Sequence, residues 1–184
     1  MSIKQWNIDD TWTLFLDRDG VINKRVYGNY ITGIDSFEFL GGAKEAITLL
    51  SSYFQFIFVV TNQQGIGKGI MTEGNLLDIH TYMCDQIHLA GGKIEKCYFA
   101  PNLEGAEDDM RKPKSVMAEL AKREFPRIDF HKCVMVGDTD TDIQFGKDLG
   151  MKTVRIKADE NIGYDADVTV ESLISFAKKI RNEL

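Results

Sequence analysis

The stretch Trp12-Thr13-Leu14-Phe15-Leu16 is followed at once by Asp17-Arg18-Asp19-Gly20. A short, uninterrupted apolar run bounded by a glycine turn is typical of a strand that is covered on both faces of a parallel sheet. In open α/β sheets, ligands bind in the crevice beyond the carboxyl ends of the strands. Two carboxylates at such an end therefore indicate a functional site. The competing interpretation is a simple Asp/Gly chain reversal, and the other strand ends decide between the two.

Strand-length apolar runs alternate with segments of helical periodicity along the rest of the chain. The predicted strands are residues 56–61, 97–100, 133–136 and 152–156. The predicted helices are residues 43–54, about 72–90, 113–126, a stretch that runs to Gly150, and a final one around residues 173–180. This alternation predicts an α/β fold with a three-layer, mainly parallel sheet and helices on both faces. We expect one domain over residues 1–184, with the motifs at about 12–156 and a C-terminal strand and helix at 167–184. Residues 21–40 are too few for a separate cap domain.

Composition and charge narrow the class of protein. The chain has 184 residues, 43% of them hydrophobic, which is enough for a full core without disulfide or metal staples. The net charge is −6 and the 22 Lys and Arg are dispersed, so we expect no nucleic-acid partner. Three widely spaced cysteines favour reduced thiols. The sequence starts without a secretory segment and has no apolar run near the roughly 20 residues that span a bilayer. We expect a cytoplasmic protein without membrane contact.

Polar residues at the other predicted strand ends favour a site over a simple turn. Thr61-Asn62 follows the second strand, Arg111-Lys112-Pro113 precedes a helix, and Gly137-Asp138-Thr139-Asp140-Thr141-Asp142 follows a later strand. In a parallel sheet these ends share one edge, so one crevice is expected to hold Asp17, Asp19, Thr61, Asn62, Lys112, Asp138 and Asp142. Like charges 4 Å apart repel by about 4 kcal/mol at an effective dielectric constant of 20. The cluster therefore needs cations, and Lys112 and a hard ion such as Mg²⁺ can supply them. Such a site suits phosphoryl transfer.

In their order and spacing, these residues resemble the four motifs of the haloacid dehalogenase-like phosphatases. The resemblance covers about residues 12–156 and implies a Rossmann-like fold and a Mg²⁺-dependent reaction on a small phosphorylated metabolite. It implies that Asp17 is the nucleophile that forms an aspartyl-phosphate, that Asp19 is the general acid and base, and that Thr61 and Asn62 hold the phosphoryl group. Lys112 would steady the charge of the nucleophile and phosphate. Mg²⁺ would be bound by Asp17, Asp138 and the backbone carbonyl of Asp19, with Asp142 in support. The same resemblance leaves Asp140 and Asp148 without a role, as solvated acids of a helix face.

Within that family, three stretches look most like the capless branch that contains heptose bisphosphate phosphatases and histidinol-phosphate phosphatases. They are residues 15–23, residues 61–69 and Arg111-Lys112-Pro113. The likeness implies that Arg111, Lys68 and Gln63 bind the substrate, with a sugar bisphosphate favoured, and that the protein can act as a monomer. A departure lies before Arg111, where these relatives usually carry a Cys/His zinc loop. This chain reads Ala100-Pro101-Asn102 and Asp108-Asp109-Met110 there, so no zinc is expected.

Spacing and charge disfavour several other kinds of site. An EF-hand needs Gly at position 6 and Glu at position 12, and neither acidic stretch has them. The stretch Gly65-Ile66-Gly67-Lys68-Gly69 lacks the P-loop and dinucleotide patterns, and reads equally as a mobile substrate loop or a plain turn. His80 fits a buried helix stripe better than a ligand position. A non-catalytic or signalling module that binds phosphate, or accepts a phosphoryl group on Asp17 without turnover, would have little use for Asp19. A polynucleotide 3′-phosphatase is disfavoured by the acidic loop at residues 104–109.

Overall fold

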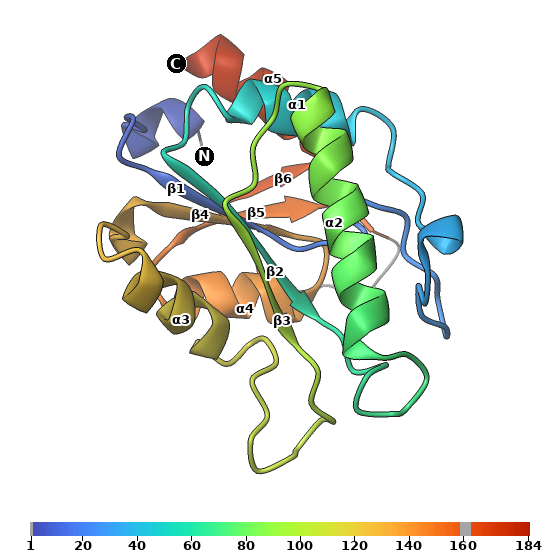
Figure 1. Cartoon of the computed structure of the whole chain (residues 1–184). Helices are drawn as coiled ribbons and strands as arrows, with labels where there is room; N and C mark the ends of the chain where they lie inside the picture. The colour runs from blue at the N-terminus through green and yellow to red at the C-terminus, as the bar shows by residue number, and fades with distance from the viewer. Residues whose placement is uncertain (1, 159–162) are drawn as a thin grey trace.

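The computed structural model describes residues 2–158 and 163–184, which build a six-stranded, fully parallel sheet (Figure 1). Its strands are β1 (Thr13–Leu16), β2 (Phe56–Asn62), β3 (Lys96–Ala100), β4 (Cys133–Gly137), β5 (Lys152–Ile156) and β6 (Val168–Val170). Their order across the sheet is β3-β2-β1-β4-β5-β6. The chain therefore moves outward from β1 in one direction to β3 and then returns to the other side at β4. The crevice between β1 and β4 is the topological switch point, where ligands bind in such sheets.

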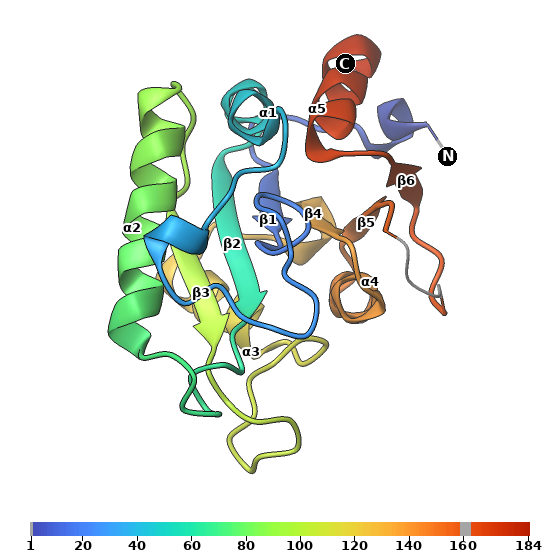
Figure 2. The same ribbon diagram turned by 90° about the vertical axis from the view of Figure 1, so that its right-hand side faces the viewer.

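Helices cover both faces of the sheet, as Figures 1 and 2 show. They are α1 (Ala43–Leu50), α2 (Glu73–Leu89), α3 (Val116–Glu124), α4 (Asp140–Asp148) and α5 (Leu173–Glu183). Alternate residues of the strands point to opposite faces, so β1 sends Leu14 and Leu16 into one core and Phe15 into the other. The first core joins α1, α2 and α5, and the second joins α3 and α4. The predicted three-layer α/β fold is confirmed.

Two predicted helix boundaries are wrong. The helix expected to begin at Pro113 begins at Val116, because residues 111–114 form a turn in which the Lys114 amide donates to the Arg111 carbonyl oxygen at 2.9 Å. That turn carries Lys112 to the sheet edge. The helix expected to reach Phe54 ends at Leu50, and the chain continues through a turn.

The loops at the carboxyl edge of the sheet lie around the crevice. Residues 21–40 lie beside β1, where Asn23 bridges to Phe39 and a short 3-10 helix (Ile34–Ser36) follows the loop. Figure 2 shows this segment running along the same edge as the ends of β2 and β3. Among the described residues, none of the helices has the length and apolarity that crossing a bilayer requires.

Candidate active site

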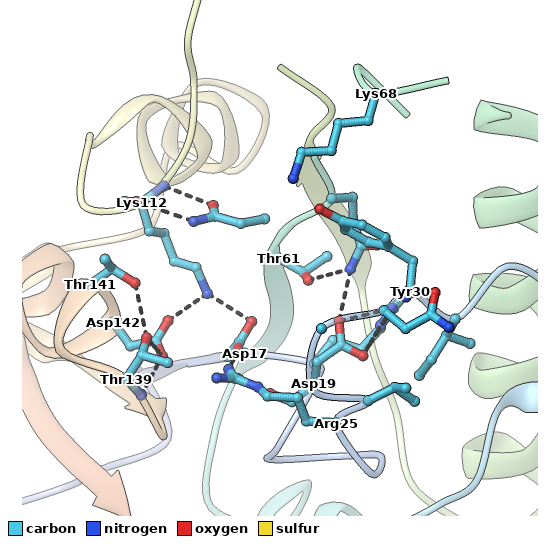
Figure 3. A pocket seen from close by; sticks show the side chains of 17 residues that line it. Asp17, Asp19, Arg25, Tyr30, Thr61, Lys68, Lys112, Thr139, Thr141 and Asp142 are labelled. Atoms are coloured by element: carbon cyan, nitrogen blue, oxygen red, sulfur yellow. Dashed lines mark hydrogen bonds and ion pairs between the residues drawn. The ribbon is translucent and has the colours of Figure 1, made fainter. Parts of the chain in front are cut away.

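A cavity of about 380 Å³ opens at the carboxyl ends of β1 and β2. All but two of the residues predicted for the site line it, namely Asp17, Asp19, Thr61, Asn62, Gln63, Lys68, Lys112 and Asp142 (Figure 3). Asp138 is not among the lining residues, but its Oδ1 lies 2.8 Å from Nη2 of Arg25, which lines the cavity. Arg111 lies outside it. The parallel sheet thus brings together side chains that are more than a hundred positions apart in the sequence.

Lys112 is the buried cation at the centre of the site. Its Nζ lies 2.8 Å from Asp17 Oδ1 and 2.6 Å from Asp142 Oδ1, and it donates to the Val60 carbonyl oxygen at 2.7 Å. Burial lowers the pKa of Lys112, but the carboxylates of Asp142 and Asp17 outweigh burial and raise it, so the ammonium stays charged. Lys112 therefore neutralises part of the acidic cluster.

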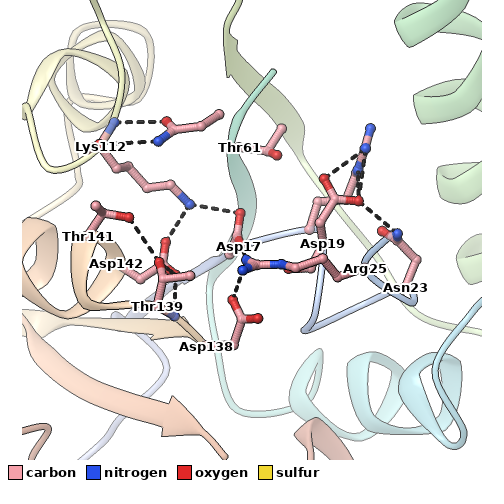
Figure 4. A network of polar contacts seen from close by, with 12 residues as sticks. Asp17, Asp19, Asn23, Arg25, Thr61, Lys112, Asp138, Thr139, Thr141 and Asp142 are labelled. Carbon is pink, nitrogen blue, oxygen red and sulfur yellow. Dashed lines mark hydrogen bonds and ion pairs between the residues drawn. The ribbon is translucent and has the colours of Figure 1, made fainter. Parts of the chain in front are cut away.

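Asp17, Asp138 and Asp142 are a candidate metal centre. Each offers a carboxylate oxygen, and the three oxygens lie within 4.8 Å of one another (Figure 4). Desolvation by burial, followed by the negative charge of Asp17, raises the pKa of Asp138 to about 8, while Arg25 acts in the opposite direction. Burial likewise raises the pKa of Asp17 to about 6, against the influence of Lys112. A bound cation would relieve this repulsion, since it favours the ionised form of each carboxylate.

Two features of the structure fit a divalent cation. The potential ligand atoms are all oxygens, as Mg²⁺ prefers. These oxygens already attract a positive charge, because Arg25 Nη2 donates to Asp138 Oδ1 at 2.8 Å. Gly20, with φ +94°, lets Asp138 approach the backbone closely. A Cβ at Gly20 would lie 2.1 Å from Asp138 Oδ2, so only glycine leaves room for the carboxylate there.

Asp19 is held on the other side of Asp17 by neighbouring donors. Arg18 Nη2 lies 3.0 Å from Asp19 Oδ1 and 2.9 Å from Asp19 Oδ2, Asn23 Nδ2 donates at 2.9 Å and Gln63 Nε2 at 2.9 Å. Burial raises the pKa of Asp19, but Arg18 and the hydrogen bonds from Asn23 and Gln63 outweigh burial and hold it below its ordinary value. The structure therefore presents an ionised Asp19.

Thr61 and Asn62 stand at the end of β2. The Thr61 hydroxyl accepts a hydrogen bond from Gln63 Nε2 at 2.9 Å inside the cavity. The Asn62 side chain instead grips the backbone of Lys112, accepting from its amide at 2.8 Å and donating to its carbonyl oxygen at 3.1 Å. Asn62 thus fixes the turn that delivers the Lys112 side chain.

The predicted substrate-binding residues occupy different positions. Gln63 lines the cavity and donates to both Asp19 and Thr61. Lys68 reaches over the cavity, its Nζ 5.5 Å from the centroid of the Tyr30 ring (Figure 3). Arg111 is not among the lining residues, and its Nη1 lies 3.5 Å from Glu104 Oε2.

Asp142 and Asp140 have structural partners at the start of α4. The Thr139 amide and hydroxyl both donate to Asp142 Oδ2, at 3.0 and 2.6 Å, so Asp142 caps the helix while its other oxygen faces Lys112. The prediction that Asp140 is a solvated acid is wrong, because Arg155 Nη2 donates to its Oδ1 at 2.5 Å. Asp148 is exposed at the end of α4, in agreement with the expectation.

Sequence reasoning missed Arg18, Arg25 and Tyr30. Arg18 is buried, pairs with Asp19 and lines the cavity. Arg25 and Tyr30 line the cavity from the loop that follows the Asp17 motif. A usable signal for Arg18 was its place between two acidic residues. The signal for Arg25 was the basic pair Lys24-Arg25 a few residues after the predicted metal ligands.

His80 gives the site a predicted acid sensitivity. Desolvation by burial and the nearby Arg18 guanidinium lower the pKa of His80 to about 3. The unfolded chain therefore binds the proton first as pH falls, and the stabilising contribution is present above about pH 6.5 and is lost toward pH 3. Between pH 6.5 and 4.5, we expect the unfolding free energy of His80→Gln to fall by about 2–3 kcal/mol less than that of wild type.

Urea denaturation at both pH values measures this difference. His88→Gln, at an exposed position of the same helix, is the matched control and should follow the wild-type pH dependence. An identical pH slope in His80→Gln and wild type would contradict the assignment.

Comparisons with known proteins converge on one family. The HAD-hydrolase-like family profile matches residues 109–167. A D-glycero-alpha-D-manno-heptose-1,7-bisphosphate 7-phosphatase of Mycobacterium bovis is 33% identical over 171 residues, covering 90% of this chain and 90% of that protein. The enzyme of the same name in Campylobacter jejuni is 36% identical over 150 residues, with coverage of 82% and 84%. A crystal structure described as D,D-heptose 1,7-bisphosphate phosphatase from B. bronchiseptica complexed with magnesium and phosphate has the same fold. Its TM-score is 0.85 at 23% identity, covering 94% of this chain and 99% of that one.

Proposed function

Since this chain belongs to the haloacid dehalogenase-like phosphatases, we propose that it is a Mg²⁺-dependent phosphomonoesterase that acts through an aspartyl-phosphate on a sugar bisphosphate. The observation that carries this proposal is the pairing of buried Asp17 with Lys112 beside Asp138 and Asp142. Such an arrangement offers a carboxylate nucleophile and positive charge at the same point. Both are needed because the transferring phosphoryl group and its attacker are negatively charged.

In the first step, a carboxylate oxygen of Asp17 forms a bond to phosphorus while the bond from phosphorus to the ester oxygen breaks. Lys112 keeps Asp17 ionised in a buried position and offsets the charge of the phosphate. The Thr61 hydroxyl, at the cavity wall, donates to a phosphoryl oxygen. Asp19 gives its proton to the leaving oxygen.

In the second step, Asp19 takes a proton from water as that water attacks phosphorus, which releases phosphate and restores Asp17. The ionised form of Asp19 suits this second step. For the first step Asp19 must be protonated, and we propose that the negative charge of the incoming phosphate, close to Asp19, raises the carboxyl pKa. Gln63 connects the two residues of this scheme, because its amide donates to both Asp19 and Thr61.

Asp17, Asp138 and the backbone carbonyl of Asp19 would hold Mg²⁺. When bound, the ion neutralises phosphate oxygens and orients the phosphoryl group against Asp17. Asp142 supports this site through Lys112 and through its cap on α4. Gly20 supports it by leaving space for Asp138.

A sugar bisphosphate is the proposed substrate because relatives at 33% and 36% identity carry the name of heptose-1,7-bisphosphate 7-phosphatases. The cavity supports an anionic substrate through Lys68, which reaches over it at a distance from the metal centre. We propose that Lys68 binds the phosphate that is not cleaved. Arg111 remains a predicted contact to the same group. In this structure its side chain lies beside Glu104 instead.

We expect kcat/KM for D-glycero-D-manno-heptose 1,7-bisphosphate to exceed that for histidinol phosphate by about 10- to 100-fold, because a charged hydrogen bond to the second phosphate contributes about 1.5–3 kcal/mol. Phosphate release in the presence of Mg²⁺ measures both rates. Lys68→Gln should shrink the preference while leaving the turnover of p-nitrophenyl phosphate unchanged within about twofold. A higher kcat/KM for histidinol phosphate would contradict the sugar bisphosphate assignment.

The same assay addresses the other candidate activities. A 3′-phosphoryl oligonucleotide should release no phosphate, in line with the acidic charge of the chain. A phosphoryl-accepting module would give one equivalent of phosphate or a stable phosphoprotein, whereas the proposed enzyme turns over many times.

A further inference from the structure

Arg25 lies at the position that the proposed metal ion would take. Its Nη2 is 2.8 Å from Asp138 Oδ1, 3.2 Å from the backbone oxygen of Asp19 and 3.9 Å from Asp17 Oδ2 (Figure 4). These three oxygens are the proposed Mg²⁺ ligands. One guanidinium nitrogen therefore contacts or approaches every one of them.

A guanidinium group and a divalent cation cannot both occupy this set of oxygens. Mg²⁺ sits about 2.0–2.1 Å from its ligands, so its coordination sphere would overlap the present position of Nη2. Binding of the ion at these oxygens requires Arg25 to leave. The metal affinity of the wild-type protein is then reduced by the fraction of molecules in which Arg25 holds the site.

Charge explains why Arg25 lies among these oxygens. The buried carboxylates of Asp17, Asp138 and Asp142 face the single ammonium of Lys112, and Arg25 supplies the second positive charge. Breaking a buried ion pair by removing one partner is strongly destabilising, because the other charge stays desolvated. Arg25 therefore stabilises the metal-free site in particular.

Arg25 approaches the ligand oxygens from the side of the cavity. Its side chain is 22% exposed, while Asp138 is 3% exposed. It belongs to the loop of residues 25–31, most of which line the 380 Å³ cavity. A displaced guanidinium would thus stay at the cavity rather than enter the core.

We propose that Arg25 is a tethered counter-cation of the metal centre: it holds the three ligand oxygens in the metal-free protein, yields them to the divalent ion, and so sets the metal affinity. This inference rests on the proposed Mg²⁺ site. It makes Arg25 a positioning residue that keeps the ligands in place before the metal arrives.

The test compares Mg²⁺ binding and thermal stability in four proteins: wild type, Arg25→Gln, Arg25→Lys and Lys24→Gln. Lys24→Gln is the matched control, because it removes the same charge from the adjacent residue, whose Nζ pairs with Glu38 Oε1 at 2.5 Å on the surface. We expect Arg25→Gln to lower the calorimetric Kd for Mg²⁺ by about tenfold or more, since the competitor is removed. Arg25→Lys should lie between Arg25→Gln and wild type, and Lys24→Gln should match wild type.

Melting temperatures separate this role from ordinary packing. Relative to wild type, Arg25→Gln should lose more melting temperature in EDTA than in saturating Mg²⁺, where Arg25 no longer holds the carboxylates. An equal loss of melting temperature in both conditions, or an unchanged Kd, would overturn the inference. Absence of Mg²⁺ binding in wild type and variants alike would overturn both this inference and the proposed metal site, whereas equal binding overturns this inference alone.

Discussion

Asp17→Asn is expected to lower Mg²⁺-dependent phosphate release by at least about 10⁴-fold, because an amide cannot form the covalent bond to phosphorus that the first step requires. Asp17 is the residue at which the site converges: it follows β1, lies at the switch point of the sheet and contacts Lys112 Nζ at 2.8 Å. The variant should remain folded, since Lys112 keeps its contact with Asp142. Initial rates with a sugar bisphosphate and with p-nitrophenyl phosphate measure the loss.

A matched control for Asp17→Asn is Asp148→Asn, the same substitution at an exposed residue at the end of α4. Its rate should equal that of wild type within about twofold. Acid-quenched protein should carry phosphate on residue 17 in wild type and none in the variant. Wild-type activity in Asp17→Asn would remove Asp17 from the role of nucleophile and would require another attacking group.

Lys112→Met is expected to lower the unfolding free energy by about 3–5 kcal/mol in EDTA, because it leaves Asp17 and Asp142 facing each other in a buried site without their shared ammonium. For a chain of this length the loss corresponds to a fall of roughly 10 °C in melting temperature. Phosphate release should fall as well, since the charge that steadies the nucleophile is gone. Urea denaturation and thermal melts measure the stability.

Two further variants show whether the loss comes from the buried charges. Lys114→Met, two residues along the chain at a half-exposed side chain that pairs with Asp109, should change the unfolding free energy by less than about 0.5 kcal/mol. Adding Asp142→Asn to Lys112→Met should restore part of the stability, because it removes one of the two uncompensated carboxylates. If the double variant were less stable than Lys112→Met by the full cost of Asp142→Asn alone, the two residues would not be coupled in the way described.

The sheet was predictable because its strands are short apolar runs that alternate with helical periodicity. Phe56-Ile57-Phe58-Val59-Val60 is such a run, and it forms β2 with both faces buried. The start of α3 was not predictable from Pro113. Proline suits the first turn of a helix, but Pro113 lies in a turn before α3. The residue before it, Lys112, is held there by a hydrogen bond from its amide to the side chain of Asn62 at the end of β2.

That the predicted site residues come together could likewise be predicted from the sequence. If every strand is parallel, the carboxyl ends of β1, β2 and β4 must share one edge, and Asp17, Thr61 and Asp138 lie at these ends. The individual partners of these residues could not be predicted from the sequence. Arg155 pairs with Asp140 and Arg18 pairs with Asp19. Neither contact leaves a periodic pattern in the sequence.

By itself, the amino-acid sequence determined the layer architecture, the position of the crevice and the residue types that meet there, because burial patterns and strand direction depend on local periodicity. Only the tertiary structure decided how the charges are shared: Lys112 between Asp17 and Asp142, and Arg25 among the proposed metal ligands. The physical reason is that a buried carboxylate pairs with whichever cation the fold brings within a few ångströms. That choice depends on loop conformation and side-chain packing between segments separated by about a hundred residues.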